Sequence, residues 1–198
     1  MHNPFLPGFY CSEELREFGF AHVGDGVQVS KDCVIVSPEN VTIGDHSRID
    51  AGCHIIATGP VEIGRHVHIG GGCHLSGRGG ITMADFSGLS QGVRIYSASD
   101  DYSGRHMTNP TVPEEFTNVR VAPCRLGRHV IVGSGSVILP GVVIGDGAAV
   151  GALSLVSHRV PEWTIYAGSP ARRVAERSRG LLVLEAAMEG TALAEVAG

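Results

Sequence analysis

The chain repeats itself with a period of twenty residues, and this repeat limits the folds open to it. One position of the repeat holds Val23, Ile43, Ile63 and Met83. Three further positions keep the same register, with Val29, Ile49, Ile69 and Leu89, with Cys33, Cys53, Cys73 and Val93, and with Ile35, Ile55, Leu75 and Ile95. Periods of about 20–50 residues are typical of solenoids, propellers and other repeat arrays. Four consecutive segments of the chain therefore share one structural template.

Within each segment, aliphatic residues recur every six positions, as at Ile43, Ile49 and Ile55. The same period returns later in the chain at Leu126, Val132, Ile138, Ile144, Val150 and Val156. A period of six matches neither the helical period of about 3.6 nor simple alternation. A strand of about four residues and a two-residue corner, repeated three times per turn, explains it, and glycines such as Gly127 and Gly145 relax the backbone beside the corners. The sequence predicts an all-β solenoid of triangular cross-section.

A solenoid needs a cap at each end, because a single turn cannot bury its own apolar face. We expect residues 1–20 to form the N-terminal cap, with a helical turn over residues 12–18 that has Ser12 as its N-cap and stops at Gly19. The solenoid itself should span residues 21–167, with an excursion over residues 97–120. Residues 168–198 should form a C-terminal helix and tail, the helix starting near Pro170 with Leu181, Leu184 and Met188 on one face.

Composition and charge exclude several classes of protein. The net charge of −5 disfavours a nucleic-acid partner. No apolar stretch approaches the roughly 20 residues that cross a bilayer, and the first residues lack the features of a signal peptide, so we expect a cytoplasmic chain without a membrane span. The five cysteines include no C-x-x-C pair, and Cys33, Cys53 and Cys73 occupy the small inward position of the repeat. We therefore predict that these three thiols pack in the core and that no metal site is present.

Three segments resemble the hexapeptide-repeat acyltransferases. They are LGRHVIVGSGSVILPGVVIGD at 126–146, GALSLV at 151–156 and YAGSPAR at 166–172, which look like the closing section of sugar O- and N-acetyltransferases. The resemblance covers about residues 23–177. It implies a left-handed parallel β-helix and a homotrimer in which acetyl-CoA and the acceptor meet between neighbouring solenoids.

The same resemblance implies a set of coenzyme contacts. By motif, these fall on Ser134, Ala152 and Ser157, with Arg172 near the adenosine phosphates. Backbone amides at the corners would share this work. The alternative is that Ser134 and Ala152 are ordinary corner residues and that Arg172 is a solvated charge on a helix.

The six-residue period fails for more than twenty residues between Ile95 and Val119. Loops of this length without secondary structure are usually functional or disordered. Its carboxylates, hydroxyls and aromatic side chains suit a hydroxylated ligand, and in the family such a loop lies beside the active site. We expect Asp101, Tyr102, Arg105 and His106 to bind the substrate.

The position at which galactoside-type acetyltransferases carry a catalytic histidine is Asp100 in this chain. An ordinary aspartate is a weaker base than histidine. Either Asp100 or its neighbour Asp101 has a pKa raised by burial beside its twin, or another histidine replaces it, or the chain is no transferase. His54 and His74 are the leading substitutes, because they occupy the same outward position in consecutive turns with Arg94 next on the ladder, and His106 in the loop is the third. Of these, His74 is the one that we predict to be catalytic.

These observations favour an acyltransferase that moves an acetyl or other acyl group from acetyl-CoA to a hydroxyl or amino group of a sugar, such as a nucleotide sugar or a polysaccharide precursor. O- and N-acylation and the length of the acyl chain both stay open. One alternative is a non-catalytic β-helix scaffold. Another is an enzyme similar to the γ-class carbonic anhydrases, which need three zinc-binding histidines, although this sequence contains no His-x4-His pair.

Overall fold

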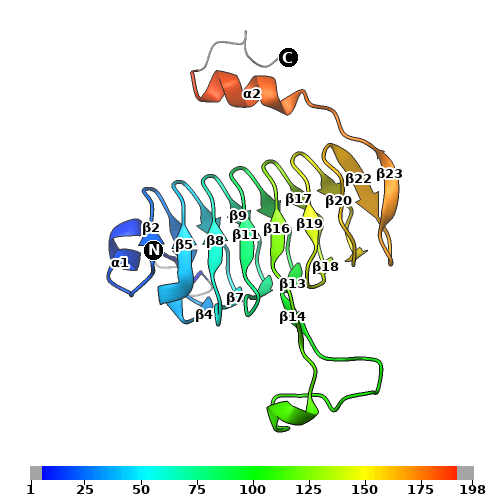
Figure 1. Ribbon diagram of the computed structural model, residues 1–198. Helices are drawn as coiled ribbons and strands as arrows, with labels where there is room; N and C mark the ends of the chain where they lie inside the picture. The colour runs from blue at the N-terminus through cyan, green and yellow to red at the C-terminus, as the bar shows by residue number, and fades with distance from the viewer. Residues whose placement is uncertain (1–5, 191–198) are drawn as a thin grey trace.

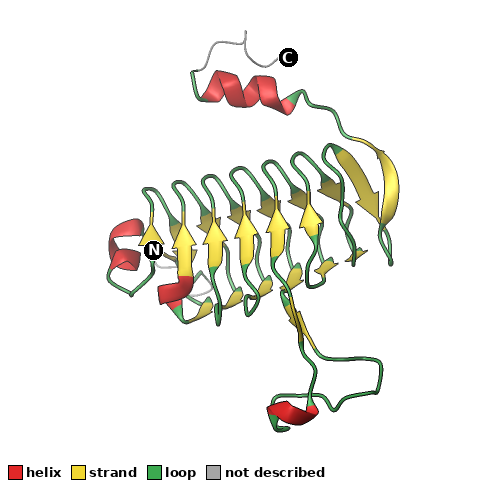
Figure 2. Cartoon of the chain, in the orientation of Figure 1, coloured by secondary structure: helices red, strands yellow, loops and turns green. Residues whose placement is uncertain are grey.

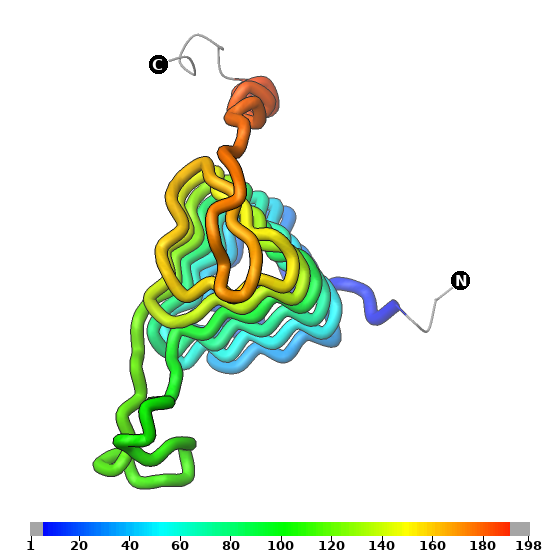
Figure 3. The backbone as a smooth tube through the Cα atoms, turned by 90° about the vertical axis from the view of Figure 1, so that its right-hand side faces the viewer, coloured from blue at the N-terminus to red at the C-terminus, as the bar shows by residue number. Residues whose placement is uncertain are grey.

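The computed structural model describes residues 6–190 and shows a left-handed parallel β-helix of about seven turns. Viewed along its axis, the solenoid is a triangle (Figure 3). Each side of the triangle is one sheet in which strands from successive turns pair in parallel, and the first and last strands of one sheet, β1 and β23, pair antiparallel. The predicted fold is therefore confirmed.

We name the three sheets by the order in which a turn of the chain crosses them. Face 1 contains β1 (Phe9–Tyr10), β3 (Gln28–Ser30), β6 (Arg48–Ile49), β9 (His68–Ile69), β12 (Gly88–Leu89), β17 (Ile131–Val132), β20 (Ala149–Val150), β22 (Thr164–Ala167) and β23 (Arg172–Glu176). Face 2 contains β4 (Val34–Val36), β7 (His54–Ile56), β10 (His74–Ser76), β13 (Arg94–Tyr96), β18 (Val137–Ile138) and β21 (Leu155–Val156). Face 3 contains β2 (His22–Val23), β5 (Val41–Ile43), β8 (Val61–Ile63), β11 (Ile81–Met83), β16 (Cys124–Leu126) and β19 (Val143–Ile144).

The strand register follows the twenty-residue period. On face 2, Ile55 pairs with Leu75 and Leu75 pairs with Ile95, so equivalent aliphatic residues of successive turns stack inside the solenoid. Cys53 and Cys73, which directly precede β7 and β10, are fully buried, and each thiol donates to a backbone carbonyl at 3.2 Å. The prediction that the thiols pack in the core is confirmed for these two, whereas Cys33, in the first turn, is only partly buried against the core.

One corner of the solenoid carries a stack of aromatic rings. His46, His66, Phe86 and His129 all have left-handed backbone angles, with φ between 53° and 58° for the histidines and 60° for Phe86. Their ring centroids are 5.0–5.1 Å apart from one turn to the next. The two histidines of the early turns and His129 therefore occupy equivalent corner positions, where their rings cover one another.

The N-terminal cap differs from the prediction in its capping residue. Helix α1 spans Ser12–Arg16, and its N-cap is Cys11. The Ser12 hydroxyl accepts a hydrogen bond from the backbone N–H of Val27 at 2.8 Å, so it ties the helix to the first turn of the solenoid instead of capping the helix. The helix also ends at Arg16, short of the expected position.

The expected C-terminal helix starting near Pro170 is wrong. Residues Arg172–Glu176 form β23, which turns back and pairs antiparallel with β22, and helix α2 begins only at Leu181 and ends at Met188. A parallel solenoid leaves the backbone groups of its last strand unpaired, and β23 satisfies them. The predicted apolar face is also wrong, because Leu184 and Met188 are exposed whereas Ala186 is buried.

Helix α2 lies back along the solenoid above the aromatic corner (Figure 1). Glu185 pairs with Arg128 and lies 2.7 Å from His129 Nε2, and Glu189 lies 3.2 Å from the Arg65 guanidinium. Ahead of the helix, Arg177 donates to the carbonyl oxygens of His129, Gly147 and Ala148. Ion pairs and hydrogen bonds thus provide much of the attachment of α2 to the solenoid. Within residues 6–190, no helix is long and apolar enough to cross a membrane.

The stacked core predicts a large effect of removing one aliphatic side chain. Leu75 is completely buried in the middle of face 2, and we expect Leu75→Ala to lower the free energy of unfolding by about 2–5 kcal/mol, because the stacked turns cannot close the resulting cavity. The exposed Val174 of β23 serves as the control, and Val174→Ala should change stability by less than about 0.5 kcal/mol. Chemical denaturation monitored by circular dichroism measures both. Equal effects would show that stacking does not hold the solenoid together.

Candidate active site

A long loop leaves the solenoid between face 2 and face 3, after β13 (Figure 2). Its stem is the antiparallel pair β14 (Ala98–Ser99) and β15 (Arg120–Val121), and its tip carries a short 3-10 helix, Glu114–Phe116. A second 3-10 helix, Pro38–Asn40, lies in an early turn. The buried Ser97 anchors the stem, because its hydroxyl donates to the carbonyl of Ser76 at 2.7 Å and accepts the N–H of Gly79 at 2.8 Å.

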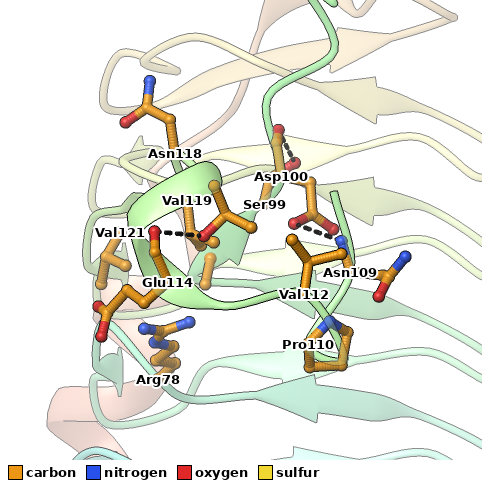
Figure 4. Close-up of a pocket in the computed structure, with 12 residues that line it drawn as sticks. Arg78, Ser99, Asp100, Asn109, Pro110, Val112, Glu114, Asn118, Val119 and Val121 are labelled. Atoms are coloured by element: carbon orange, nitrogen blue, oxygen red, sulfur yellow. Dashed lines mark hydrogen bonds between the residues drawn. The ribbon is translucent and has the colours of Figure 1, made fainter. Parts of the chain in front are cut away.

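The loop and the wall of the solenoid enclose a pocket of about 670 Å³ (Figure 4). Its lining comes from the solenoid corner, from the stem and from the returning half of the loop: Arg78, Ala98, Ser99, Asp100, Asn109, Pro110, Val112, Glu114, Thr117, Asn118, Val119 and Val121. The lining therefore combines charged and amide groups with apolar side chains. A small polar ligand fits such a surface.

Asp100 lies at the edge of this pocket, immediately after the stem. Its side chain is half-buried, and among residues 6–190 its Oδ1 receives only a long hydrogen bond of 3.4 Å from the backbone N–H of Asn109. In Figure 4 the carboxylate faces the interior of the loop. A carboxylate in this position retains lone pairs with which to accept a proton or bind a cation.

The neighbouring Asp101 has a different role in the structure. His106 Nδ1 lies 2.7 Å from its Oδ2, and the backbone N–H and hydroxyl of Ser103 donate to it at 2.8 and 2.9 Å. The bond with His106, followed by those from Ser103, lowers the pKa of Asp101 to about 2. The alternative that Asp101 is a base with a raised pKa is therefore wrong. This cluster folds the loop on itself.

None of the four loop residues expected at the substrate lines the pocket. Asp101 and His106 bond to each other, and Tyr102 is 93% exposed. Arg105 is likewise exposed, and its backbone N–H donates to Ser103. Among the polar residues that do line the pocket, Asp100 was predicted from the sequence, whereas Arg78, Asn109, Glu114 and Asn118 were not. The one local signal for them was the Gly-Arg-Gly-Gly run at 77–80, which marks an unusual corner.

His74 lies elsewhere, on the outer surface of face 2. Its strand pairs place it between His54 and Arg94, as the ladder predicted, and its ring centroid is 6.0 Å from that of His54. Burial lowers the pKa of His74, and the charges of His54 and Arg94 lower it further. His74 is therefore neutral near pH 7 and able to accept a proton. It does not line the loop pocket, so the two candidate bases occupy different surfaces.

The four predicted coenzyme residues fall on two corners of the last turns. Ser134 and Ala152 lie in successive turns at the corner between faces 1 and 2. At this corner the N–H of Leu153 donates to the Ser134 carbonyl at 2.9 Å. Ser157 and Arg172 line a second pocket of about 220 Å³ beyond the other end of β21. Ala152 is exposed and small, so a ligand has room to pass it. Arg172 adds a cation beside the hydroxyl of Ser157, a donor set that suits phosphate oxygens.

A left-handed β-helix with a six-residue period is the fold of the hexapeptide-repeat proteins. A family described as "Bacterial transferase hexapeptide (six repeats)" matches residues 123–158. The dTDP-4-amino-4,6-dideoxy-D-glucose acyltransferase of Escherichia coli is 38% identical over 183 residues, which cover 92% of this chain and 95% of that protein. The chain belongs to the hexapeptide-repeat acyltransferases, and it is an acyl-CoA-dependent acyltransferase.

Solved structures agree with this assignment. AntD, an N-acyltransferase from Bacillus cereus crystallised with dTDP and 3-hydroxybutyryl-CoA, superposes with a TM-score of 0.90 at 40% identity, over 93% of this chain and 98% of that one. A maltose O-acetyltransferase from Clostridium difficile 630 has a TM-score of 0.57 at 23% identity, over 84% of this chain and 74% of that one, and shares the fold. Within residues 6–190, no group of three or more histidine, cysteine, aspartate or glutamate side chains is arranged to hold a metal ion.

The Asp101 cluster predicts a test of loop order. Asp101→Asn removes the charge that His106 and Ser103 bind, so we expect trypsin to cleave after Arg105 several-fold faster at pH 8, with the melting temperature of the solenoid unchanged. Because the pKa of the folded state is lowered, the stabilisation is present above about pH 4 and is lost as the pH falls towards 2.

Glu115 is the matched control, because it lies in the same loop, is exposed and makes no side-chain hydrogen bond among the described residues. Glu115→Gln should leave the rate of cleavage after Arg105 as it is. Mass spectrometry of timed digests identifies the cut site. Equal cleavage rates in the wild type and in Asp101→Asn would contradict a structural role for the cluster.

Proposed function

We propose that the protein transfers an acyl group from acyl-CoA to the amino group of a dTDP-linked amino-dideoxy sugar. The observation that carries this proposal is similarity along nearly the whole chain to two proteins of that kind. The E. coli relative is named for dTDP-4-amino-4,6-dideoxy-D-glucose, and an AntD variant was crystallised with dTDP-4-amino-4,6-dideoxyglucose and coenzyme A. This proposal is narrower than the prediction from the sequence, because it includes N-acylation of a sugar and leaves out O-acylation.

Asp100 is the proposed general base. Acyl-CoA supplies an activated thioester, which the neutral amine of the acceptor attacks. Asp100 accepts the proton that the acceptor nitrogen loses as the C–N bond forms, and coenzyme A leaves as its thiolate when the C–S bond breaks. Backbone N–H groups stabilise the negative charge on the carbonyl oxygen in the transition state. The place of Asp100 in the pocket, with few partners of its own, supports this role.

A spacing in AntD supports the same residue. The AntD crystal structures include variants in which an aspartate or a serine was exchanged, and the two exchanged positions are ten residues apart. Ser90 and Asp100 have the same spacing here. Ser90 follows β12 and is half-buried, and its carbonyl accepts the Cys73 thiol. We infer that Ser90, which the sequence did not single out, acts together with Asp100.

The coenzyme is proposed to follow the corner and face of the last turns. Ser134 and Ala152 provide a narrow edge for the pantetheine arm, and the pocket of Ser157 and Arg172 provides a cation for the adenosine phosphates. The residues present thus fit acyl-CoA at the level of their chemistry. Acetyl-CoA is the simplest donor of this kind.

We further propose a homotrimer in which neighbouring solenoids complete each site. The outward residues of face 2 are Val34, Val36, His54, Ile56, His74, Ser76, Arg94, Tyr96, Val137 and Leu155. Arg94 is the one formally charged residue in this set, and Val34 and Val36 are 44% and 41% exposed in the single chain. A surface with a single formal charge and several exposed aliphatic side chains suits contact with another copy. Acylation of a glycan precursor in the cytoplasm is the corresponding cellular role.

The proposed base predicts the kinetics of two variants. We expect Asp100→Asn to lower kcat by about 10²–10⁴-fold with dTDP-4-amino-4,6-dideoxyglucose and acetyl-CoA, with little change in acetyl-CoA affinity. If His74 is the base instead, His74→Ala shows that loss and Asp100→Asn does not. The measurement is kcat for both variants from pH 6 to 9.

His46 provides the control, because its ring is stacked at the distant aromatic corner. His46→Ala should leave kcat within about twofold of the wild type. Rates near the wild-type value for both Asp100→Asn and His74→Ala would reject both residues. Absence of any acylated product from the wild type would reject the proposed acceptor itself.

A second prediction concerns the coenzyme corner. Ala152→Trp fills the edge proposed for the pantetheine arm, so we expect coenzyme A to lose its ability to raise the melting temperature, although the exposed position lets the solenoid fold. Val174→Trp, at an exposed position of β23, is the matched control and should keep the rise. The measurement is the melting temperature of each variant with and without coenzyme A. A full rise in Ala152→Trp would place the coenzyme elsewhere.

A further inference from the structure

Arg78 lies at a corner whose backbone is held on both sides. A Cβ on Gly77 would lie 2.6 Å from Val61 Cγ2, and a Cβ on Gly79 would lie 2.5 Å from the Ser97 carbonyl oxygen. The N–H of Gly79 donates to the Ser97 hydroxyl at 2.8 Å, which joins this corner to the stem of the loop. The position of the Arg78 backbone relative to the pocket is therefore set by close packing.

The guanidinium of Arg78 is unengaged among the described residues. Several other arginines bind carboxylates, as Arg48 does with Asp50, or carbonyl oxygens, as Arg177 does. Arg94 and Arg125 make no such contact among the described residues, but neither of them lines the loop pocket. Arg78 makes no ion pair and no side-chain hydrogen bond within residues 6–190, and it is exposed. It is also the one cation among the residues that line the loop pocket. An Arg without a protein partner, on a rigid support inside a pocket, is available to a ligand.

One cation, Arg78, and two carboxylates, Asp100 and Glu114, line the pocket, and Glu114 lies on the Arg78 side without forming an ion pair with it among the described residues (Figure 4). Arg78 projects from the solenoid wall, whereas Asp100 lies across the pocket at the stem of the loop (Figure 4). An amino sugar linked to a nucleoside diphosphate carries the opposite arrangement, with an ammonium group at the sugar and negative charge on the diphosphate. The two ends of such a ligand match the two ends of the pocket. Because the chain has a net charge of −5, binding of an anion depends on a local cation of this kind.

We propose that Arg78 binds the diphosphate of the acceptor and thereby selects nucleotide-linked amino sugars over free ones. Arginine suits this task because its planar guanidinium donates two parallel hydrogen bonds to phosphate oxygens. The ammonium group of the same acceptor then lies on the side of Asp100, where its proton is to be removed. This inference rests on the proposed function, and it adds a binding residue and a basis for substrate selection.

The test compares Arg78→Gln with Arg125→Gln under steady-state conditions, with dTDP-4-amino-4,6-dideoxyglucose and acetyl-CoA. Arg125 is the matched control, because it is an exposed arginine of face 3 that lines none of the pockets described here. We expect Arg78→Gln to raise the KM for the nucleotide sugar and the inhibition constant of dTDP by about 10- to 100-fold, the range for a lost hydrogen bond to a charged group. The KM for acetyl-CoA should stay within about twofold, as should kcat at saturating acceptor.

Salt provides a second readout. Sodium chloride should raise the acceptor KM of the wild type and of Arg125→Gln, and should raise that of Arg78→Gln less, because the screened contact is already lost. Arg78→Lys should recover part of the affinity, because lysine restores the positive charge but cannot donate two parallel hydrogen bonds to the phosphate oxygens. Circular dichroism melts confirm that each variant is folded.

Three outcomes would overturn the inference. An unchanged acceptor KM and an unchanged dTDP inhibition constant in Arg78→Gln would show that Arg78 does not bind the diphosphate. A raised KM for acetyl-CoA alone would show that Arg78 binds the coenzyme instead. Equal effects in Arg125→Gln would show a general effect of charge. If the wild type does not acylate the nucleotide sugar at all, the proposed function fails first, which separates the two failures.

Discussion

The hydrogen bonds between successive turns are the constraint on which the rest of this structure depends. Gly44 N–H donates to the Ile63 carbonyl and Gly64 N–H to the Met83 carbonyl, both at 2.8 Å, and the same pattern runs along all three faces. Each turn must therefore match the shape of its neighbours. A slip of one residue would move every core aliphatic residue to the outside. The strict period of the sequence is the consequence of this matching.

The loop pocket occurs at the corner where this constraint is relaxed. The two extra residues of the early turns fall between face 2 and face 3, because Ile55 and Ile63 are eight residues apart whereas Ile138 and Ile144 are six apart. The long loop leaves the solenoid at the same corner, and Arg78 lies one turn before it. Stacked strands on either side hold this corner rigidly. The solenoid thus provides rigid walls, and the extra residues at this corner provide the functional side chains of the pocket.

Two sequence predictions failed because they treated the chain locally. Residues 172–176 lie within a stretch that the pattern of Leu181, Leu184 and Met188 suggested was helical, yet they pair with β22 because the end of the sheet would otherwise be bare. Asp101 was considered as a base beside Asp100, yet His106 and Ser103 fold back onto it. In both cases the deciding partner is a backbone or side chain whose position depends on the folded chain. Neither of these contacts produces a repeating pattern in the sequence.

The sequence by itself determined the solenoid, its inward cysteines, the ladder of His54, His74 and Arg94, and the presence of a long loop, because each follows from a period that repeated stacking makes visible. Only the tertiary structure decided which polar groups share the loop pocket. Arg78, Asp100 and Asn109 line one pocket because the loop folds back against the solenoid wall, and no period relates them. A repeat records contacts that recur in every turn, whereas a binding pocket is made of contacts that occur once.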